Sequence, residues 1–526
     1  MFTQLLALLA FGAFSDAIVQ QVELTGQESQ EELLALAARV VPSERQLDYH
    51  REEYIGFIHF GPNTFTGVEW GNGMEDPAVF APPRVDTDQW CRVMKDAGMR
   101  KVIYTAKHHD GFCNWQTRYN TTFSVHVSPW EDGRGDVLRR LADSCREHGL
   151  RLGVYLSPAD LYQIESTDGL YGNGSTPVPS VIPTDPRSLV SDPARARSVE
   201  GLPTFRHELD DYNRYFMNQL YEVLTEYGPV HEVWFDGAHP KRKGGQTYRK
   251  DLWYAMVREL APQAVIFGGP DVRWCGNEHG GTRDDEWNVL PIQSVALSGV
   301  DRPQPNVGTD AELFAGGYEV YGKQYEARLL NYMVSEVDTS IRDGWFWRNE
   351  DEQHVKPADE IFDIYERSVG GNAVFLLNVP PAKDGRFGAR YVACLAEVGR
   401  RIRATYGTDL AAGFTSEAGL DSQSLDSYWQ PDGTTGTVEV TLREPIRANR
   451  VVLQEAIGAV GQRVREHALD AWIDGGWREV SRAGVIGYKR IHRFEAVQTA
   501  RFRIRVLSAR AAPGIATFAA HLEAAS

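Results

Sequence analysis

Residues 101–111 read KVIYTAKHHDG, a short run rich in apolar and β-branched residues that ends in two histidines and Asp-Gly. Residues 233–237 read VWFDG, a similar apolar run that ends in Asp236 and a glycine. Runs of this kind are typical of strands that are buried on both faces of a parallel sheet. Both stretches therefore predict a strand with polar side chains directly beyond its carboxyl end.

The same pattern recurs on either side of these two stretches, where short β-rich runs alternate with amphipathic segments. The expected strands are Gly56–Phe60, Lys101–Ala106, Leu150–Leu156, His231–Phe235, Ala264–Gly268 and Ala373–Leu377. The segments Asp136–His148 and Tyr212–Tyr227 carry apolar residues at the three- and four-residue spacing of a helix. This alternation predicts an α/β fold with a parallel sheet, either a closed (β/α)8-like barrel or an open doubly wound sheet.

The positions of the polar residues favour the barrel. His59, His108, His109, Tyr155 and Asp236 lie at or just beyond the carboxyl ends of separate expected strands. In a (β/α) barrel these ends meet on one face, and that face holds the active site. We therefore expect a (β/α)8-like catalytic domain whose site gathers these side chains.

Near residue 410 the alternation of β-rich runs with amphipathic segments ends. From there to the end we expect short alternating strands at Gly436–Leu442, Arg450–Glu455, Ala468–Asp474 and Arg501–Val506. Turns are frequent and no helix is evident, which indicates a β-sandwich. The predicted organisation is a possible signal peptide at 1–20, a barrel catalytic domain at 21–408 and a C-terminal β-sandwich domain at 409–526. We expect the sandwich to pack on the barrel rather than to bind carbohydrate.

Charge and composition narrow the classes of partner. The formal net charge is −17, with 72 acidic and 55 basic residues, and this charge repels nucleic acid. No stretch approaches the roughly 20 apolar residues of a membrane span, so none is expected. The five cysteines show no metal-binding spacing, and we expect most of them to be buried free thiols. Nothing in the sequence assigns an oligomeric state.

The N-terminal residues 5–14, LLALLAFGAF, form an apolar run of signal-peptide length. Small and polar residues follow it at Ser15–Ala17, although the usual positive charges before it are absent. This run favours a secreted or periplasmic protein. One alternative is an N-terminal helix that packs on the rest of the protein. The other is that the start of translation was assigned at the wrong residue.

Two carboxyl groups in different environments are what a retaining glycosidase requires, one as nucleophile and one as acid and base. Asp236 is the candidate nucleophile, because apolar residues precede it and His109 or Arg273 could hold it ionised. Its partner is Glu278 or Glu286, both in the stretch GPDVRWCGNEHGGTRDDEW. We favour Glu278, since its glycine-rich surroundings predict a loop that could fold over a pocket.

Six strings, in order along residues 45–405, resemble those of the glycoside hydrolase family 29 α-L-fucosidases: FIHFGPNTF, YTAKHHDGFCNW, LGVYLSP, VWFDGA, GPDVRWCGNE and GGNAVFLLNVPP. The resemblance implies hydrolysis of terminal α-linked L-fucose from fucosylated oligosaccharides or glycoconjugates. The double displacement would pass through a fucosyl-enzyme on Asp236. The GNE context is similar to that of the branch that cleaves α-1,3/1,4 (Lewis-type) linkages, in which this glutamate, Glu278 here, is the acid/base.

The resemblance also implies which residues bind the sugar. These are His59, Glu69, Trp70, His108, His109, Tyr155, Trp234 and Arg273. No cofactor and no metal are implied, and the histidines are better explained as partners of sugar hydroxyls than as metal ligands. Two rival functions remain: a weakly catalytic fucose-binding protein that has lost its acid, and another retaining exo-glycosidase on the same barrel.

Overall fold

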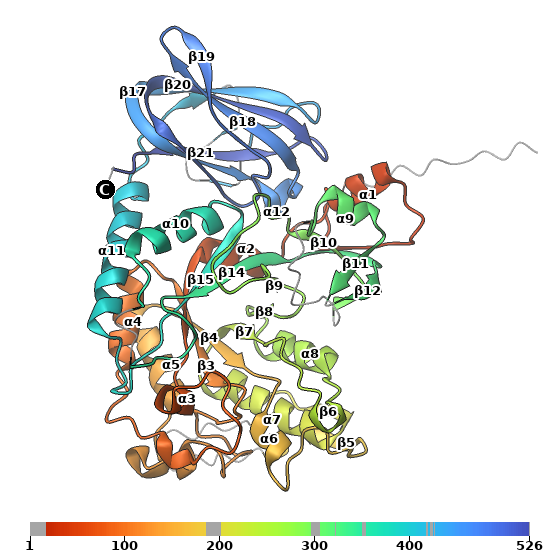
Figure 1. The fold of residues 1–526 in the computed structure, drawn as a ribbon. Coiled ribbons are helices and arrows are strands. Elements are labelled where there is room, and N and C mark those ends of the chain that lie inside the picture. The colour runs from red at the N-terminus through yellow and green to blue at the C-terminus, as the bar shows by residue number, and fades with distance from the viewer. Residues whose placement is uncertain are drawn as a thin grey trace, which may run out of the picture.

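The computed structural model describes residues 17–185, 201–295, 306–320, 322–349, 354–416, 419–420, 424–425 and 427–524. The apolar run at 5–14 lies outside the described residues. At the centre of the molecule eight strands form a closed barrel in the order β14, β15, β2, β3, β4, β7, β8, β9, with the C-terminal sheet domain next to it (Figure 1). The predicted (β/α)8-like barrel is thus confirmed, and the open-sheet alternative is wrong.

The barrel strands are parallel to their neighbours throughout. Their bounds are β2 Tyr54–Ile58, β3 Lys101–Lys107, β4 Arg151–Leu156, β7 Val230–Trp234, β8 Val265–Phe267, β9 Val272–Trp274, β14 Val334–Ser340 and β15 Ala373–Asn378. Every residue of β3 and of β15 is buried. This explains why the apolar runs of the sequence located these strands.

Two barrel strands, β9 and β14, are absent from the strands that the sequence predicts. β14 has the sequence VSEVDTS and is buried at all seven positions, although most of its side chains are polar. β9 has only three residues and carries Arg273 at its centre. Neither strand shows the continuous apolar run that identifies a strand buried on both faces.

The longer helices lie on the outside of the barrel (Figure 1). They are α2 Glu44–Glu52, α4 Thr87–Asp96, α5 Val137–His148, α7 Asp211–Glu226, α8 Lys250–Leu260, α10 Ala358–Val369 and α11 Ala389–Tyr406. In α5, the Asp136 carboxylate caps the first turn by accepting from the Arg139 amide, and the helix ends at Gly149 with φ +66°. The side chain at the cap and the left-handed glycine explain both ends of this helix.

Shorter elements lie in the connections around the barrel. The short helices are α1 Gln30–Ala37, α3 Pro62–Thr66, α6 Leu161–Glu165 and α9 Asp310–Phe314. β1 Gln21–Glu23, β13 Leu329–Tyr332 and β10 Val289–Ile292 form a three-stranded antiparallel sheet. Two further pairs form two-stranded antiparallel sheets: β5 Val178–Ile182 with β6 Phe205–Leu209, and β11 Gly317–Val320 with β12 Lys323–Glu326.

The C-terminal domain is an antiparallel β-structure, as the sequence predicts. Its elements are β16 Thr415–Ser416, β17 Gly436–Glu455, α12 Ile457–Val460, β18 Val464–Ile473, β19 Gly476–Ala483, β20 Arg490–Ala509 and β21 Ile515–His521. The strand order is β16-β17-β20-β18-β19, and β21 pairs with β17. Two expected strands are one in the structure, because β17 continues through irregularities in its register near Thr441 and Ala448.

Buried polar contacts attach the C-terminal domain to the barrel. Arg450 of β17 forms an ion pair with Glu366 of α10, with 2.6 Å between Nε and Oε1. Gln462 accepts from the Asn288 amide at 2.9 Å and donates to the carbonyl oxygen of Glu286 at 3.1 Å. The domain therefore contacts the segment that follows the loop carrying Glu278.

The remaining expectations concern thiols and membrane spans. The five cysteines are free, four of them buried and Cys394 half-buried, which confirms that most are buried thiols. Within the described part of the chain, no helix combines the length and apolar character that a bilayer crossing requires.

Candidate active site

A cavity of about 520 Å³ opens at the carboxyl ends of the barrel strands. Its volume lies within the roughly 300–1,000 Å³ of small-molecule sites. Nine of the ten predicted site residues line it: His59, Glu69, Trp70, His108, His109, Tyr155, Trp234, Asp236 and Glu278. The barrel brings these residues together because each follows, or ends, a strand whose carboxyl end faces the same side.

The cavity has a buried floor and an exposed rim. The floor consists of side chains that are at most 8 % exposed: Phe57, His59, His108, His109, Tyr155, Trp234, Phe267 and Asp338. Trp70, Lys241 and Glu278 are exposed and lie on the rim. Trp70 is 49 % exposed, and its ring centre lies 4.1 Å from that of His109. A ligand would therefore bury one end among the floor residues and present its other end to the rim.

Asp236 lies two residues beyond the end of β7, and its two carboxylate oxygens have different partners. Oδ1 accepts a hydrogen bond from the Ala238 amide at 2.6 Å, and Oδ2 accepts from the Tyr155 hydroxyl at 3.2 Å. Nε2 of His109 lies 3.8 Å from Oδ2. These contacts fix the orientation of a carboxylate that faces the cavity.

Two of the three histidines of the floor, His59 and His109, are held by neutral partners. His59 Nδ1 lies 2.9 Å from the Asn378 side-chain oxygen, and His109 Nδ1 lies 2.8 Å from the Ser157 hydroxyl. Burial lowers the pKa of His59 to about 3 and that of His108 well below its usual value. Burial also lowers the pKa of His109, against the opposing charge of Asp236. Neutral imidazoles can donate and accept hydrogen bonds, which suits sugar hydroxyls.

Asp110 follows the two histidines that suggested a metal site, but it has a different role. Its carboxylate accepts from the Phe112 amide at 2.8 Å, and burial raises its pKa to about 8. Within the described ranges, no group of three or more His, Cys, Asp and Glu side chains is arranged to hold a metal ion. Asp110 instead stabilises the turn that places His108 and His109.

Glu278 lies on the loop after β9 and lines the cavity. Its Oε2 accepts from the indole nitrogen of Trp345 at 3.2 Å. Partial burial at the rim raises its pKa, the Trp345 hydrogen bond lowers it, and the negative charges of Asp236 and Glu69 raise it further. The net effect is a carboxyl group with a raised pKa that shares a cavity with the carboxylate of Asp236.

Glu69 connects the rim to the segment that carries Trp345. One oxygen accepts from the Trp345 amide at 2.8 Å, and the other pairs with Arg348. The same segment is fixed from the floor, since the Asn378 amide donates to the Trp345 carbonyl oxygen at 2.8 Å. These contacts place the Trp345 indole beside Glu278.

Arg273 does not line the cavity, and this corrects the expectation that it contacts the sugar or neutralises Asp236. Its side chain is fully buried on β9, where Nη2 lies 2.6 Å from Oε2 of Glu286. Glu286 is also fully buried, pairs with Arg283, and has a pKa that these arginines hold below its usual value. The alternative acid/base is thus an ionised structural carboxylate away from the cavity. Side chains along a strand alternate between faces. Trp274 lines the cavity, so its neighbour Arg273 on β9 points away from the cavity.

Several lining residues were not predicted from the sequence. They are Phe57, His239, Lys241, Phe267, Trp274, Asp338 and Trp345. Asp338 lies within the polar strand β14, where it accepts from the Trp274 indole at 2.7 Å. Burial raises its pKa well above the usual value, and the charges of Glu278 and Asp236 add to this. Phe57 and Phe267 lie on the predicted strands β2 and β8, so strand position was the signal that could have found them. Trp274 ends β9, which the sequence did not reveal.

The chain is similar to known α-L-fucosidases over most of its length. The family model described as alpha-L-fucosidase matches residues 36–405. Alpha-L-fucosidase 1 of Arabidopsis thaliana is 31 % identical over 504 residues, covering 92 % of this chain and 88 % of that protein.

Two solved structures are similar over nearly the whole chain. A putative alpha-L-fucosidase from Bacteroides ovatus is 35 % identical, with a TM-score of 0.78, and the match covers 97 % of this chain and 79 % of that one. A glycoside hydrolase family 29 fucosidase from Ruminococcus gnavus, solved in complex with fucose, is 26 % identical with a TM-score of 0.73. That match covers 92 % of this chain and 95 % of the other.

Proposed function

The chain belongs to glycoside hydrolase family 29, the α-L-fucosidases, and from this premise we propose that it releases terminal L-fucose with retention of configuration, using Asp236 as nucleophile and Glu278 as acid/base. A single observation carries the assignment of roles. Two carboxyl groups line one cavity, one oriented by three polar neighbours and the other with a raised pKa. Environments that differ in this way are what an acid and a nucleophile require.

The two steps follow from these environments. In the first, Asp236 attacks the anomeric carbon while protonated Glu278 donates its proton to the leaving oxygen. The covalent fucosyl-enzyme then reacts with water, from which the Glu278 carboxylate takes a proton, and the carbon–oxygen bond to Asp236 breaks. The raised pKa of Glu278 supports the first role, because a larger fraction of the group is protonated near neutral pH.

The floor of the cavity suits the fucosyl group. His59, His108 and His109 offer neutral nitrogens to hydroxyl groups. Phe57, Trp234 and Phe267 supply an apolar wall, in which the rings of Trp234 and Phe267 stack at 3.9 Å. A 6-deoxy sugar has both hydroxyl groups and one methyl group, so a floor of mixed polarity matches it.

We extend the proposal to linkage and location. The GNE string at 276–278 supports cleavage of α-1,3/1,4-linked fucose from branched, Lewis-type glycans, and the apolar run at 5–14 supports export to the cell exterior or periplasm. Incubation with linkage-defined fucosylated oligosaccharides tests the first point. N-terminal sequencing of protein recovered from the native host tests the second.

The assignment of Glu278 is tested by chemical rescue. We expect azide to restore turnover of an aryl α-L-fucoside by Glu278→Gln, because azide attacks the fucosyl-enzyme without a general base. Glu286→Gln is the matched control, and azide should not rescue it, since Glu286 is a buried partner of Arg273. Rescue of the Glu286 variant alone would reverse the assignment.

The nucleophile and the activity are tested in parallel. A 2-fluoro-fucosyl fluoride should label Asp236, as peptide mass spectrometry would detect, and the first product seen by NMR should retain the α configuration. Label on another residue would contradict the proposed mechanism. Fucose binding without release would instead indicate a binding protein, and cleavage of other aryl glycosides but not the fucoside would indicate a different exo-glycosidase.

A further inference from the structure

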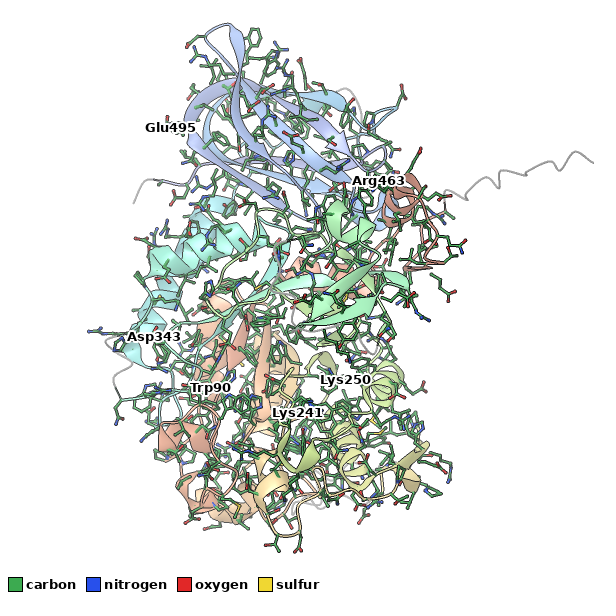
Figure 2. The ribbon with its side chains drawn as sticks, turned by 45° about the vertical axis from the view of Figure 1, so that its right-hand side comes forward. Trp90, Lys241, Lys250, Asp343, Arg463 and Glu495 are labelled. Atoms are coloured by element: carbon green, nitrogen blue, oxygen red, sulfur yellow. The ribbon has the colours of Figure 1, made fainter. Side chains whose placement is uncertain are left out.

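The loop that follows β7 places a lysine, Lys241, on the rim of the cavity. Among the described residues that line the cavity, it is the one Lys or Arg, whereas four are carboxyl groups: Glu69, Asp236, Glu278 and Asp338. Figure 2 shows Lys241 and Lys250 on the barrel half of the molecule, away from Arg463 and Glu495 of the C-terminal domain. An ammonium group therefore lies at the mouth of the site of a protein whose overall charge is −17.

A neutral partner holds this ammonium group. The Lys241 amine contacts Nδ1 of His239, whose Nε2 lies 2.6 Å from the carbonyl oxygen of Gln246. Because a carbonyl oxygen can only accept, Nε2 carries the hydrogen and Nδ1 accepts from the lysine. Burial lowers the pKa of His239, and the charge of Lys241 lowers it further, which keeps the ring neutral. The contact therefore orients the ammonium group without neutralising it.

No carboxylate among the described side chains forms an ion pair with Lys241. The neighbouring Arg242 differs, because it pairs with Glu165. The charges that act on the pKa of Glu278 are those of Asp236 and Glu69. The positive charge of Lys241 is thus not neutralised by an ion pair with a described carboxylate. It is also not among the charges that shift the pKa of Glu278.

The backbone of the loop is anchored on both sides of Lys241. The Tyr171 hydroxyl donates to the Pro240 carbonyl oxygen at 3.1 Å, and the Tyr248 hydroxyl donates to that of Ala238 at 3.3 Å. The Gln246 side chain accepts from the Gly172 amide at 2.9 Å. Ordering the loop before a ligand arrives reduces the entropy cost of using the lysine as a contact.

The rim is where the leaving group of the substrate must lie. The fucosyl group fills the floor next to Asp236, so the leaving group extends past Glu278 toward Trp70 and Lys241. Trp70 offers an exposed aromatic face, on which a sugar ring can stack.

We propose that Lys241 forms a subsite for an anionic group on the leaving-group side of the substrate, so that the enzyme prefers fucosylated glycans whose neighbouring sugars carry a carboxylate or a sulfate ester. This inference rests on the proposed function. It assigns a chemical class to the substrate that the fold alone does not specify. A cation facing an anion at an exposed rim raises the association rate and adds modest affinity.

The test compares three fucosylated oligosaccharides that differ at one position of the leaving group: a neutral parent, its carboxylate derivative and its sulfate ester. For the wild-type protein at low salt we expect kcat/KM on at least one acidic substrate to exceed that on the neutral parent by about threefold to fivefold, the size of an exposed charge pair. Which acidic arm shows the preference identifies the anionic group.

Variants then assign the preference to one side chain. In Lys241→Met the acidic-to-neutral ratio should fall to about one, and Lys241→Arg should keep most of the preference, because the charge remains. Lys243→Met is the matched control: it removes the same charge from the same loop, outside the cavity lining, and should retain the wild-type ratio. Using the ratio within each variant cancels any general loss of activity.

Two outcomes would overturn the inference. A ratio near one in the wild-type protein, or an equal ratio in wild type and Lys241→Met, with fucose release intact, would refute the anionic subsite alone. Absence of fucose release from every substrate by the wild-type protein would refute the proposed function and the subsite with it.

Discussion

At the scale of single residues, the proposed proton donor, Glu278, is tuned by one indole nitrogen. The Trp345 hydrogen bond to Glu278 lowers the pKa of a carboxyl group that burial and two neighbouring negative charges raise. Trp345→Phe keeps an aromatic ring and removes the donor, so the pKa of Glu278 should rise. Since the proposed first step needs protonated Glu278, the alkaline limb of the kcat/KM profile should move to higher pH.

The measurement is the pH dependence of kcat/KM on a fucosylated disaccharide, whose poor leaving group requires the acid. Trp274→Phe is the matched control, because its indole lines the same cavity but donates to Asp338. Its alkaline limb should stay in place. A limb that is unchanged or moves to lower pH in Trp345→Phe would show that this hydrogen bond does not tune the proton donor.

Residue-level prediction from the sequence succeeded where a motif and a strand end coincide. His59, His108, His109 and Asp236 follow strands that the apolar pattern had located, so their common position could be inferred. Arg273 lies in a string that resembles the family, but its side chain pairs with buried Glu286 and does not line the cavity. Its strand has three residues and no apolar run, and so nothing in the sequence indicated which face its side chain would take.

At the scale of elements, β14 shows why part of the floor escaped prediction. Its residues Ser335, Glu336, Asp338, Thr339 and Ser340 are buried in the barrel. Two of them accept hydrogen bonds that the closed barrel provides: Glu336 from the Trp234 indole at 2.9 Å and Asp338 from the Trp274 indole at 2.7 Å. A sequence pattern reports hydrophobicity, and it therefore cannot identify a strand whose burial is stabilised by tertiary hydrogen bonds.

Glu336, on β14, should make the free energy of unfolding depend measurably on pH. Burial raises its pKa to about 7 from a usual 4.5, against the hydrogen bonds from Tyr49 and Trp234. Between these values the unfolded chain loses a proton that the folded protein keeps, so this group's contribution to the free energy of unfolding falls as pH rises. Glu336→Gln cannot titrate and removes the effect.

We expect the free energy of unfolding of wild type, relative to Glu336→Gln, to decrease by on the order of 3 kcal/mol between about pH 4.5 and pH 7. Urea unfolding of both proteins at several pH values measures this difference. A difference that is constant with pH, or that grows in favour of wild type, would mean that the buried carboxyl is ionised throughout.

At the scale of the whole molecule, the C-terminal domain contributes to the stability of the barrel. Gln462 is fully buried and accepts from the Asn288 amide, two residues after Glu286. Gln462→Ala leaves this amide without a partner at the interface and should lower the free energy of unfolding by about 1–3 kcal/mol. Denaturant unfolding of the intact chain measures the loss.

Gln430→Ala is the matched control, because its side chain lies in the same domain and donates to the Ala512 carbonyl oxygen in an exposed position. It should change the free energy of unfolding by less than about 0.5 kcal/mol. Equal effects of the two variants would show that the interface amide is satisfied in another way and that the domain is only loosely attached.

The proposed nucleophile, Asp236, follows the barrel strand β7, whereas the proposed proton donor, Glu278, lies on a loop. Moving the nucleophile would require a shift in strand register, which would turn every neighbouring side chain to the wrong face. A surface loop tolerates insertions and deletions far more readily. Evolution can therefore relocate the proposed proton donor while the proposed fucose pocket stays the same. Related enzymes can then differ in the leaving group that they prefer and keep their specificity for fucose.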